Sequence, residues 1–176
     1  YTDRIEDYYE RLAGHYTIAR LWAKALHFSE LSGDKLSSRY INDQALTFYE
    51  SALMILDKRD EIGLKANLID KKKIVIKQKM GNIYYVTSRW EDGIKIVTDT
   101  MVETDKISDL VLKAQSIHLL GKFQKAMSKW DIALQFFEDA LEIVGKLKDK
   151  QLMSDILREI AGIKYFTGKI EQSLII

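Results

Sequence analysis

A fixed spacing of small residues recurs along the sequence, and it constrains the fold more than any other feature. Gly121 and Ala133 lie twelve residues apart, and two other pairs keep that interval at a distance of forty residues. These pairs are Gly81 with Gly93, and Ala161 with Ser173. A small residue lets a second helix approach closely, since packed helix axes lie ~8–10 Å apart according to the contacting side chains. We therefore expect stacked helical hairpins, each burying the apolar stripe of its neighbour.

The composition favours an almost wholly helical chain. None of the 176 residues is proline, and proline in a helix interior costs ~3 kcal/mol. The chain is 47% hydrophobic and 30% charged, which is typical of folded proteins. No apolar run approaches the ~18 residues of a membrane span. We expect an all-α, cytoplasmic protein without membrane contact. Because it begins at Tyr1, we also expect it to be part of a longer protein.

The apolar periodicity predicts nine helices. Their expected ranges are 3–17, 21–39, 43–58, 62–87, 91–105, 108–127, 131–147, 151–166 and a truncated 169–176. Asn42 and Ser108 are the expected N-caps of the third and sixth helices, and Gly33 is a potential break in the second. The short links predict antiparallel neighbours.

We interpret residues 1–176 as a single helical-repeat domain. Residues 1–41 would hold the N-terminal helices, and 42–60 the second helix of the first unit. The successive repeat units would be 62–105, 108–147 and 150–176, with the last one truncated.

Two segments carry a resemblance to a known family. Met80-Gly81-x2-Tyr84 followed by Gly93, and Leu120-Gly121-x2-Gln124 followed by Ala133-x3-Phe137 and Ala140, resemble the tetratricopeptide repeat. The resemblance covers about residues 21–176 and implies a tetratricopeptide-like α-solenoid, a right-handed superhelix of antiparallel helix pairs. The sequence departs from the family in its period, which is 40 instead of ~34 residues. The usual proline is missing, and Gly93, Thr100 and Ser173 replace common alanines.

A second resemblance lies upstream. Its segments are Leu12-Ala13-Gly14-His15-Tyr16, Lys24-Ala25-Leu26, Ser32-Gly33-Asp34, Asn42-Asp43-Gln44-Ala45-Leu46 and Tyr49-Glu50-Ser51-Ala52-Leu53. Together they look like the junction that opens the repeat array of STAND- or AAA-type signalling ATPases in bacterial cyclases, transcription activators and kinases. It implies the regulatory or sensor repeats of a larger signalling protein, with the catalytic domain elsewhere.

The tetratricopeptide resemblance also implies a binding surface, because the first helix of each pair lines the concave groove in that family. The implied groove residues are Lys71, Gln78, Asn82, Tyr85, Gln115, His118, Lys122, Lys125, Asp155, Arg158 and Tyr165. Asn82 and Lys122 occupy matching places in consecutive units and are suited to hold a carboxylate or a peptide backbone. The alternative is that these residues are ordinary solvated polar side chains.

Charge and motif content argue against several other functions. A net charge of +1 lacks the basic excess of a nucleic-acid binder. The Lys71–Lys73 run lacks the interleaved aromatics of a base-stacking surface, and we interpret it as a solvated helix face. The three histidines show no metal-ligand spacing. No phosphate-binding loop or nucleophile turn occurs. We expect no enzyme activity, cofactor, metal or nucleic acid.

Two functions remain open. The first is a scaffold that binds a protein or peptide, and the alternative is a sensor that closes around a small molecule or signalling peptide. An open polar groove would favour the first, and an enclosed apolar pocket of ~300–1,000 Å³ the second. We interpret Trp90 and Trp130 as packing residues, since they recur at one repeat position. We also expect a homo-oligomer through the exposed C-terminal repeat, at Leu174-Ile175-Ile176.

Overall fold

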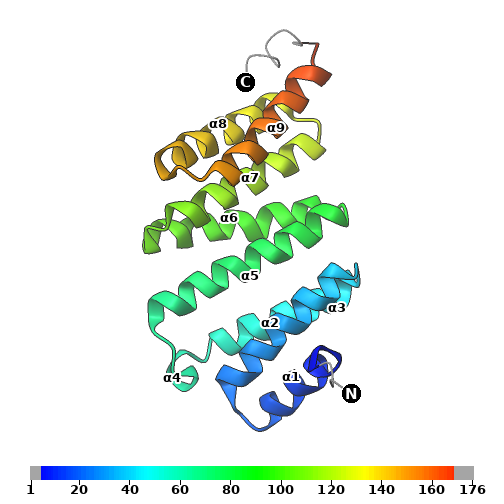
Figure 1. Cartoon of the computed structure of the whole chain (residues 1–176), viewed down its shortest axis with the longest axis vertical. Coiled ribbons are helices and arrows are strands. Elements are labelled where there is room, and N and C mark those ends of the chain that lie inside the picture. The colour runs from blue at the N-terminus through cyan, green and yellow to red at the C-terminus, as the bar shows by residue number, and fades with distance from the viewer. Residues whose placement is uncertain (1–4, 169–176) are drawn as a thin grey trace. The chain divides into compact units, whose positions relative to one another are not determined.

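The computed structural model describes residues 5–168, and its regular secondary structure in that range is helical (Figure 1). This confirms the all-α prediction. The elements are the 3-10 helix η1 (Ile5–Tyr8) and helices α1 (Tyr9–Ile18), α2 (Trp22–Ser38), α3 (Asn42–Leu56), α4 (Arg59–Ile62), α5 (Ala66–Val86), α6 (Trp90–Ile107), α7 (Leu110–Ala126), α8 (Trp130–Leu147) and α9 (Lys150–Phe166). The ninth expected helix, at 169–176, lies outside the described residues, and so does the expected oligomer contact at Leu174–Ile176.

The helix map agrees with the prediction except in two places. Residues Arg59–Ile62 form the separate short helix α4, which ends at Gly63 with a φ of 72°. Glycine reaches this left-handed conformation without a steric penalty, so the long fourth helix begins at Ala66 instead of residue 62. Gly33 does not break the second helix, because α2 continues through it to Ser38.

Both predicted N-caps are wrong. Ser108 adopts a left-handed conformation and is the C-cap of α6. The capping role passes to Asp109, whose carboxylate accepts a hydrogen bond from the Leu112 N–H at 3.1 Å. Asn42 is already the first residue of α3 and forms no side-chain cap bond at that helix start. In each of these short links one residue takes a left-handed conformation to reverse the chain: Ser108 before α7 and Tyr40 before α3. The start of the next helix is therefore not where the sequence pattern placed it.

These left-handed turn residues follow the forty-residue period of the sequence. Ser88, Ser128 and Gly168 have φ values of 59°, 59° and 77°, and Ser108 and Lys148 have φ values of 52° and 57°. Three of these turns end the first helix of a pair, and two end the second. The backbone therefore repeats even where the residue type does not.

The chain divides into two compact units, residues 1–83 and 84–176, each of which has its own helix packing. In the first unit α1 packs on α2 and α2 on α3, as consecutive antiparallel helices (Figure 1). In the second unit α6 packs on α7, α7 on α8 and α8 on α9. The apolar cluster between the last three helices is formed by Ala114, Ile117, Ala133, Phe137, Ala140, Val144, Ile156, Ile160 and Ile163.

The small residues have the packing role that their spacing predicts. A Cβ added at Gly121 would lie 2.5 Å from the Phe137 ring, and one at Gly33 would lie 2.5 Å from the Tyr49 ring. Gly93 is in similar contact with Phe123. Thr100, which replaces an alanine of the family pattern, is fully buried. Its hydroxyl donates to the Val97 carbonyl at 2.6 Å and lies 3.0 Å from Ser116 Oγ, so the extra polar atom is satisfied.

Trp130 has the expected packing role, although its side chain is only half-buried. It packs against the apolar cluster of the second unit, and its ring stacks on Phe166 at 6.4 Å between centroids. Trp90 is also half-buried, at the first position of α6. Among the helices described, none has both the length and the apolar character needed to cross a membrane.

Gly121→Ala is expected to destabilise the chain by ~1–3 kcal/mol, because the added methyl overlaps the Phe137 ring. Gly145→Ala, on α8, is the matched control. A Cβ there meets nothing within 4 Å, so alanine should stabilise the helix by ~0.5–1 kcal/mol. Urea unfolding of both variants tests the contact, and equal shifts would show that Gly121 is not at a close approach of two helices.

Candidate functional site

The predicted groove residues of the first unit, Lys71, Gln78 and Asn82, all lie on α5. Gln78 is only 8% exposed, Lys71 is half-buried and Asn82 is exposed. The Asn82 amide donates to the Gln78 carbonyl of its own helix at 3.1 Å.

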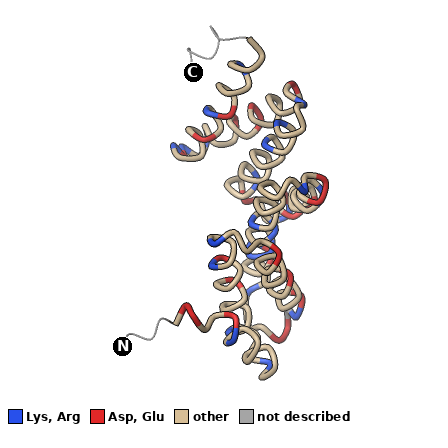
Figure 2. Tube along the Cα trace, turned by 90° about the vertical axis from the view of Figure 1, so that its right-hand side faces the viewer, with Lys and Arg blue, Asp and Glu red and all other residues tan. Residues whose placement is uncertain are grey.

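Several lysines on α5 are paired with acids. Lys72 contacts Glu30 at 2.8 Å and Lys79 contacts Asp34 at 2.6 Å, both across to α2. Lys73 pairs with Asp57. Figure 2 shows basic and acidic residues interspersed along each unit. The Lys71–Lys73 run is thus half-buried and ion-paired, whereas a solvated helix face was expected from the sequence.

In the second unit the predicted residues do meet, on the end of α5 and on helices α7 and α9. The Lys122 ammonium lies 4.5 Å from the centre of the Tyr85 ring. That ring meets Phe123 edge-on, at 5.7 Å between centroids. Phe123 is fully buried beside Gly93. The core therefore holds the tyrosine in place, and the tyrosine supports the lysine through its π face.

His118 lies one helical turn before Lys122 on α7. Its ring is half-buried and tilted against Phe137, at 5.7 Å between centroids. The Nε2 atom is fully buried and has no hydrogen-bond partner. A buried polar atom without a partner is uncommon in folded proteins and calls for a structural or functional explanation.

Helix α9 supplies the acids of this surface, and they already have partners. Glu159 accepts a hydrogen bond from Lys125 at 2.7 Å. Asp155 accepts one from Arg158 at 3.0 Å. By contrast, Lys122 forms no ion pair within residues 5–168. The α9 carboxylates are thus engaged, while the central cation of the surface is not.

Gly162 of α9 leaves room in the same surface. A Cβ there would meet only the mobile end of Lys125, at 3.4 Å from Nζ. We name Tyr85, His118, Lys122, Lys125, Asp155, Glu159 and Gly162 the α7–α9 surface.

Two other predicted groove residues lie outside this surface. Gln115 is exposed one turn before His118. Tyr165 is 62% exposed and packs edge-on to Phe166 at 5.9 Å, away from these contacts.

Glu159 is the acidic member of the surface that sequence reasoning missed. It lies four residues after Asp155, on the same helical face, and that spacing was the available signal. Its importance comes from its pairing with Lys125, across 34 residues of sequence.

Burial depresses the basicity of both central groups. Burial lowers the pKa of Lys122, and the Glu159 and Asp155 carboxylates partly oppose this effect. Burial also lowers the pKa of His118, with a further contribution from the Lys122 charge, again partly opposed by Glu159 and Asp155. Near neutral pH the surface therefore holds a neutral imidazole beside a partly desolvated ammonium. Such groups are suited to binding an anionic or hydrogen-bonding partner.

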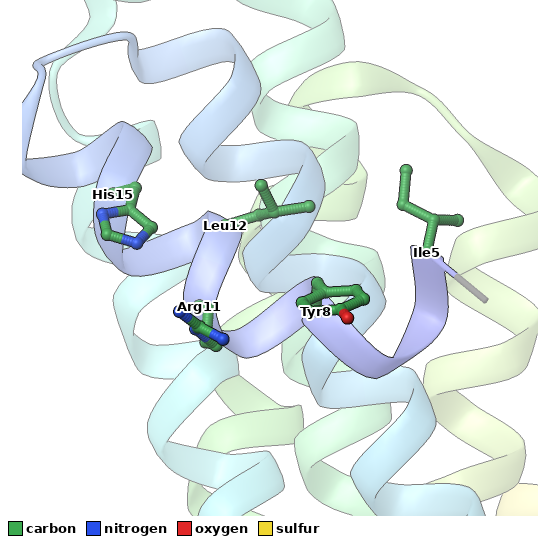
Figure 3. Close-up of a pocket in the computed structure, with 5 residues that line it drawn as sticks. All are labelled: Ile5, Tyr8, Arg11, Leu12 and His15. Carbon is green, nitrogen blue, oxygen red and sulfur yellow. The ribbon is translucent and has the colours of Figure 1, made fainter. Parts of the chain in front are cut away.

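A hollow of about 550 Å³ also lies on the first unit (Figure 3). Its lining residues, Ile5, Tyr8, Arg11, Leu12 and His15, all come from η1 and α1. Ile5 and Tyr8 are 56% and 44% exposed, so the hollow is open surface on one helical segment. It does not have the enclosed apolar walls expected of a small-molecule pocket. Within residues 5–168, no group of three or more histidines and acids is placed to hold a metal ion.

The helical arrangement is shared with several solved structures. The Rap conjugation gene regulator of the plasmid pLS20, in complex with the Phr* peptide, is 19% identical and has a TM-score of 0.73. The match covers 86% of this chain and 40% of the regulator. BtubC from P. vanneervenii is 16% identical over 98% of this chain and 66% of its own, with a TM-score of 0.72. The kinesin light chain TPR-like repeats of P. anserina are 12% identical over 96% of this chain and 80% of their own, with a TM-score of 0.71.

These likenesses show the fold. No family model matches the sequence, and no curated protein is similar to it at the sequence level. The chain spans 40% of the length of the Rap regulator and 66% of that of BtubC. The chain thus has the tetratricopeptide-like helical-repeat fold, as the resemblance in its sequence implied.

Lys122→Met is expected to leave the free energy of unfolding unchanged within ~0.5 kcal/mol, the range of substitutions without a structural role. The cation–π contact with Tyr85 and the cost of desolvation oppose each other at this position. Lys125→Met, the matched control, should cost ~0.2–1 kcal/mol because it breaks the ion pair with Glu159. Denaturant unfolding at neutral pH compares the two. A larger loss for Lys122→Met would assign that lysine a structural role.

His118 should make the stability depend on pH. Its folded-state pKa lies below the ordinary value of ~6.5, so the unfolded chain binds more protons as the pH falls through that value. The contribution of neutral His118 is complete above pH ~6.5 and is lost below it. His118→Gln should remove this component from the urea-unfolding free energy measured between about pH 5 and pH 8. The assignment would be contradicted if the unfolding free energies of variant and wild type differed by the same amount at every pH in that range.

Proposed function

We propose that this chain is a repeat scaffold that binds a protein or peptide, and that the α7–α9 surface holds a segment of the partner. The observation that carries the proposal is the state of Lys122 and His118. Both are partly withdrawn from water, and neither has a polar partner within residues 5–168. A surface that leaves a cation and a buried nitrogen unsatisfied gains most when a ligand supplies the missing groups.

The geometry of the surface suits a peptide segment. Residues spaced by three or four positions on α7 and α9 present their side chains in two adjoining rows. Gln115 and Arg158 add exposed hydrogen-bond donors at the edges. Gly162 allows a peptide backbone to approach α9 closely, since only the end of the Lys125 side chain lies near it. The surface thus combines room for a main chain with polar groups that can fix its position.

The structural neighbours agree with this type of function. One of them is a gene regulator solved with a bound peptide. We further propose that the chain is the regulatory or sensor repeat region of a larger signalling protein, as its upstream resemblance to STAND-type proteins implies. The sequence of the complete gene tests this part: an adjoining ATPase or cyclase domain would support it, and a short stand-alone protein would contradict it.

Selection from a displayed library of random peptides tests the binding function. Peptides enriched on the wild-type chain should lose affinity by ~10-fold or more when Gly162→Gln fills the space on α9. The matched control is Gly145→Gln on α8, also a helical glycine with open space around its Cβ position. It should leave the affinity unchanged. Failure to enrich any peptide, or equal binding to wild type and Gly162→Gln, would overturn the proposed function.

A further inference from the structure

The three tryptophans of the chain differ in what covers their rings. In the first unit the Trp22 indole N–H donates to Glu61 at 2.7 Å. In the second unit the Trp130 ring stacks on Phe166, with the two ring planes 18° apart. Trp90 is half-buried, yet within residues 5–168 it has neither a stacked ring nor an indole hydrogen bond. The uncovered side of this indole is therefore available to a ligand.

The forty-residue repeat explains why Trp90 lacks a cover. Trp90 and Trp130 are equivalent positions, the first residues of α6 and α8. Phe166 is the last residue of α9, and the equivalent last residue of α7 is Ala126. A methyl group is too short to extend over an indole as a phenyl ring does. The two repeats thus share a tryptophan, but the earlier one lacks the residue that covers it.

A hollow of about 280 Å³ lies beside Trp90. It lies between the start of α6 and the end of α7, and its lining residues are Ser88, Arg89, Trp90, Glu91, Asp92 and Met127. Trp130 and Phe166 meet between the corresponding ends of α8 and α9. A cavity of ~150 Å³ holds a benzene molecule, whereas pockets for drug-sized ligands begin at ~300 Å³. The hollow therefore has room for one aromatic side chain and the backbone next to it.

We propose that this space, the Trp90 hollow, binds an aromatic side chain of a partner protein, which takes the place that Phe166 occupies in the next repeat. The bound ring stacks on the free face of the indole, in the offset arrangement that aromatic pairs prefer. The flexible thioether of Met127 contacts the edge of that ring. No residue of the α7–α9 surface lines the Trp90 hollow, so this is a second binding site, separate from the one proposed above.

The charges around the Trp90 hollow favour a basic residue beside the bound ring. Arg89 pairs with Asp92 at 2.8 Å, and its guanidinium lies 4.6 Å from the centre of the Tyr84 ring. Glu91 is exposed and forms no ion pair within residues 5–168. The uncompensated charge among the lining residues is thus negative, and a lysine or arginine next to the aromatic residue complements it.

An NMR titration with capped dipeptides tests the site. The probe is acetyl-arginyl-phenylalanine amide, added to the ¹⁵N-labelled wild-type chain. The three tryptophans give three indole N–H signals, and Trp90→Phe identifies the signal of Trp90, which should shift and saturate. Acetyl-arginyl-alanine amide should bind ~10-fold more weakly because it lacks the ring. Acetyl-glutamyl-phenylalanine amide should bind at least ~2-fold more weakly because its charge opposes that of Glu91.

Ala126→Phe supplies the covering ring from the chain itself. It should raise the melting temperature, because the new phenyl group and Trp90 bury each other. It should also weaken binding of the arginyl-phenylalanine probe by ~10-fold or more. Val102→Phe adds the same ring at an exposed position of α6, and as the matched control it should leave the affinity unchanged. Glu91→Lys should reverse the preference between the arginyl and glutamyl probes.

Three results would overturn the aromatic site. They are an unshifted Trp90 signal, equal binding of the phenylalanine and alanine probes, and undiminished binding to a folded Ala126→Phe chain. An unchanged preference in Glu91→Lys would overturn the basic neighbour of the ring. A Trp90 signal that shifts when the wild-type chain alone is concentrated would show that a second copy, and not a partner, fills the hollow.

The α7–α9 surface is distinguished in the same titration. A shift of the Gly162 amide signal with the Trp90 signal unchanged would place the probe on that surface. This would overturn the Trp90 site and leave the proposed function intact. Gly162→Gln should not alter the affinity of the probe for the Trp90 hollow, so a loss of library peptides in that variant concerns the proposed function alone.

Discussion

The contact between a helical glycine and a facing aromatic ring is the interaction on which the second unit and the α7–α9 surface depend. Phe137 packs against Gly121 and also lies beside His118. Phe123 packs against Gly93 and meets the Tyr85 ring edge-on. These buried contacts therefore set the depth of His118 and the position of the ring beneath Lys122. Close helix packing determines the electrostatics of the surface, because burial is the largest cause of both pKa shifts.

The α7–α9 surface also departs from the rules that stabilise its surroundings. Elsewhere on α7, lysines have carboxylate partners, and buried hydroxyls such as that of Thr100 are hydrogen-bonded. At His118 and Lys122 the folded chain leaves polar groups incompletely satisfied. Local inconsistencies of this kind are expected where a protein retains groups for function at a cost in stability.

The chain shares its fold with solved structures at 12 to 19% identity. Within this chain, small residues and their aromatic partners keep the helix spacing. The fold therefore does not specify the partner. Function has to be argued from the particular side chains of the α7–α9 surface. In this chain these include a histidine and a lysine one helical turn apart, with acids on the adjoining helix already engaged.

The sequence by itself determined the helices, the forty-residue repeat and the close approaches at Gly93 and Gly121, because periodicity and residue size act locally. It also placed His118 and Lys122 on one helical face. Only the tertiary structure decided which charges are paired, since Lys125 and Glu159 are separated by 34 residues of sequence. Likewise, it decided that Gln78 is buried and that Asp109, not Ser108, caps α7. These outcomes depend on distances between helices and on the backbone conformation of short turns, which side-chain patterns do not encode.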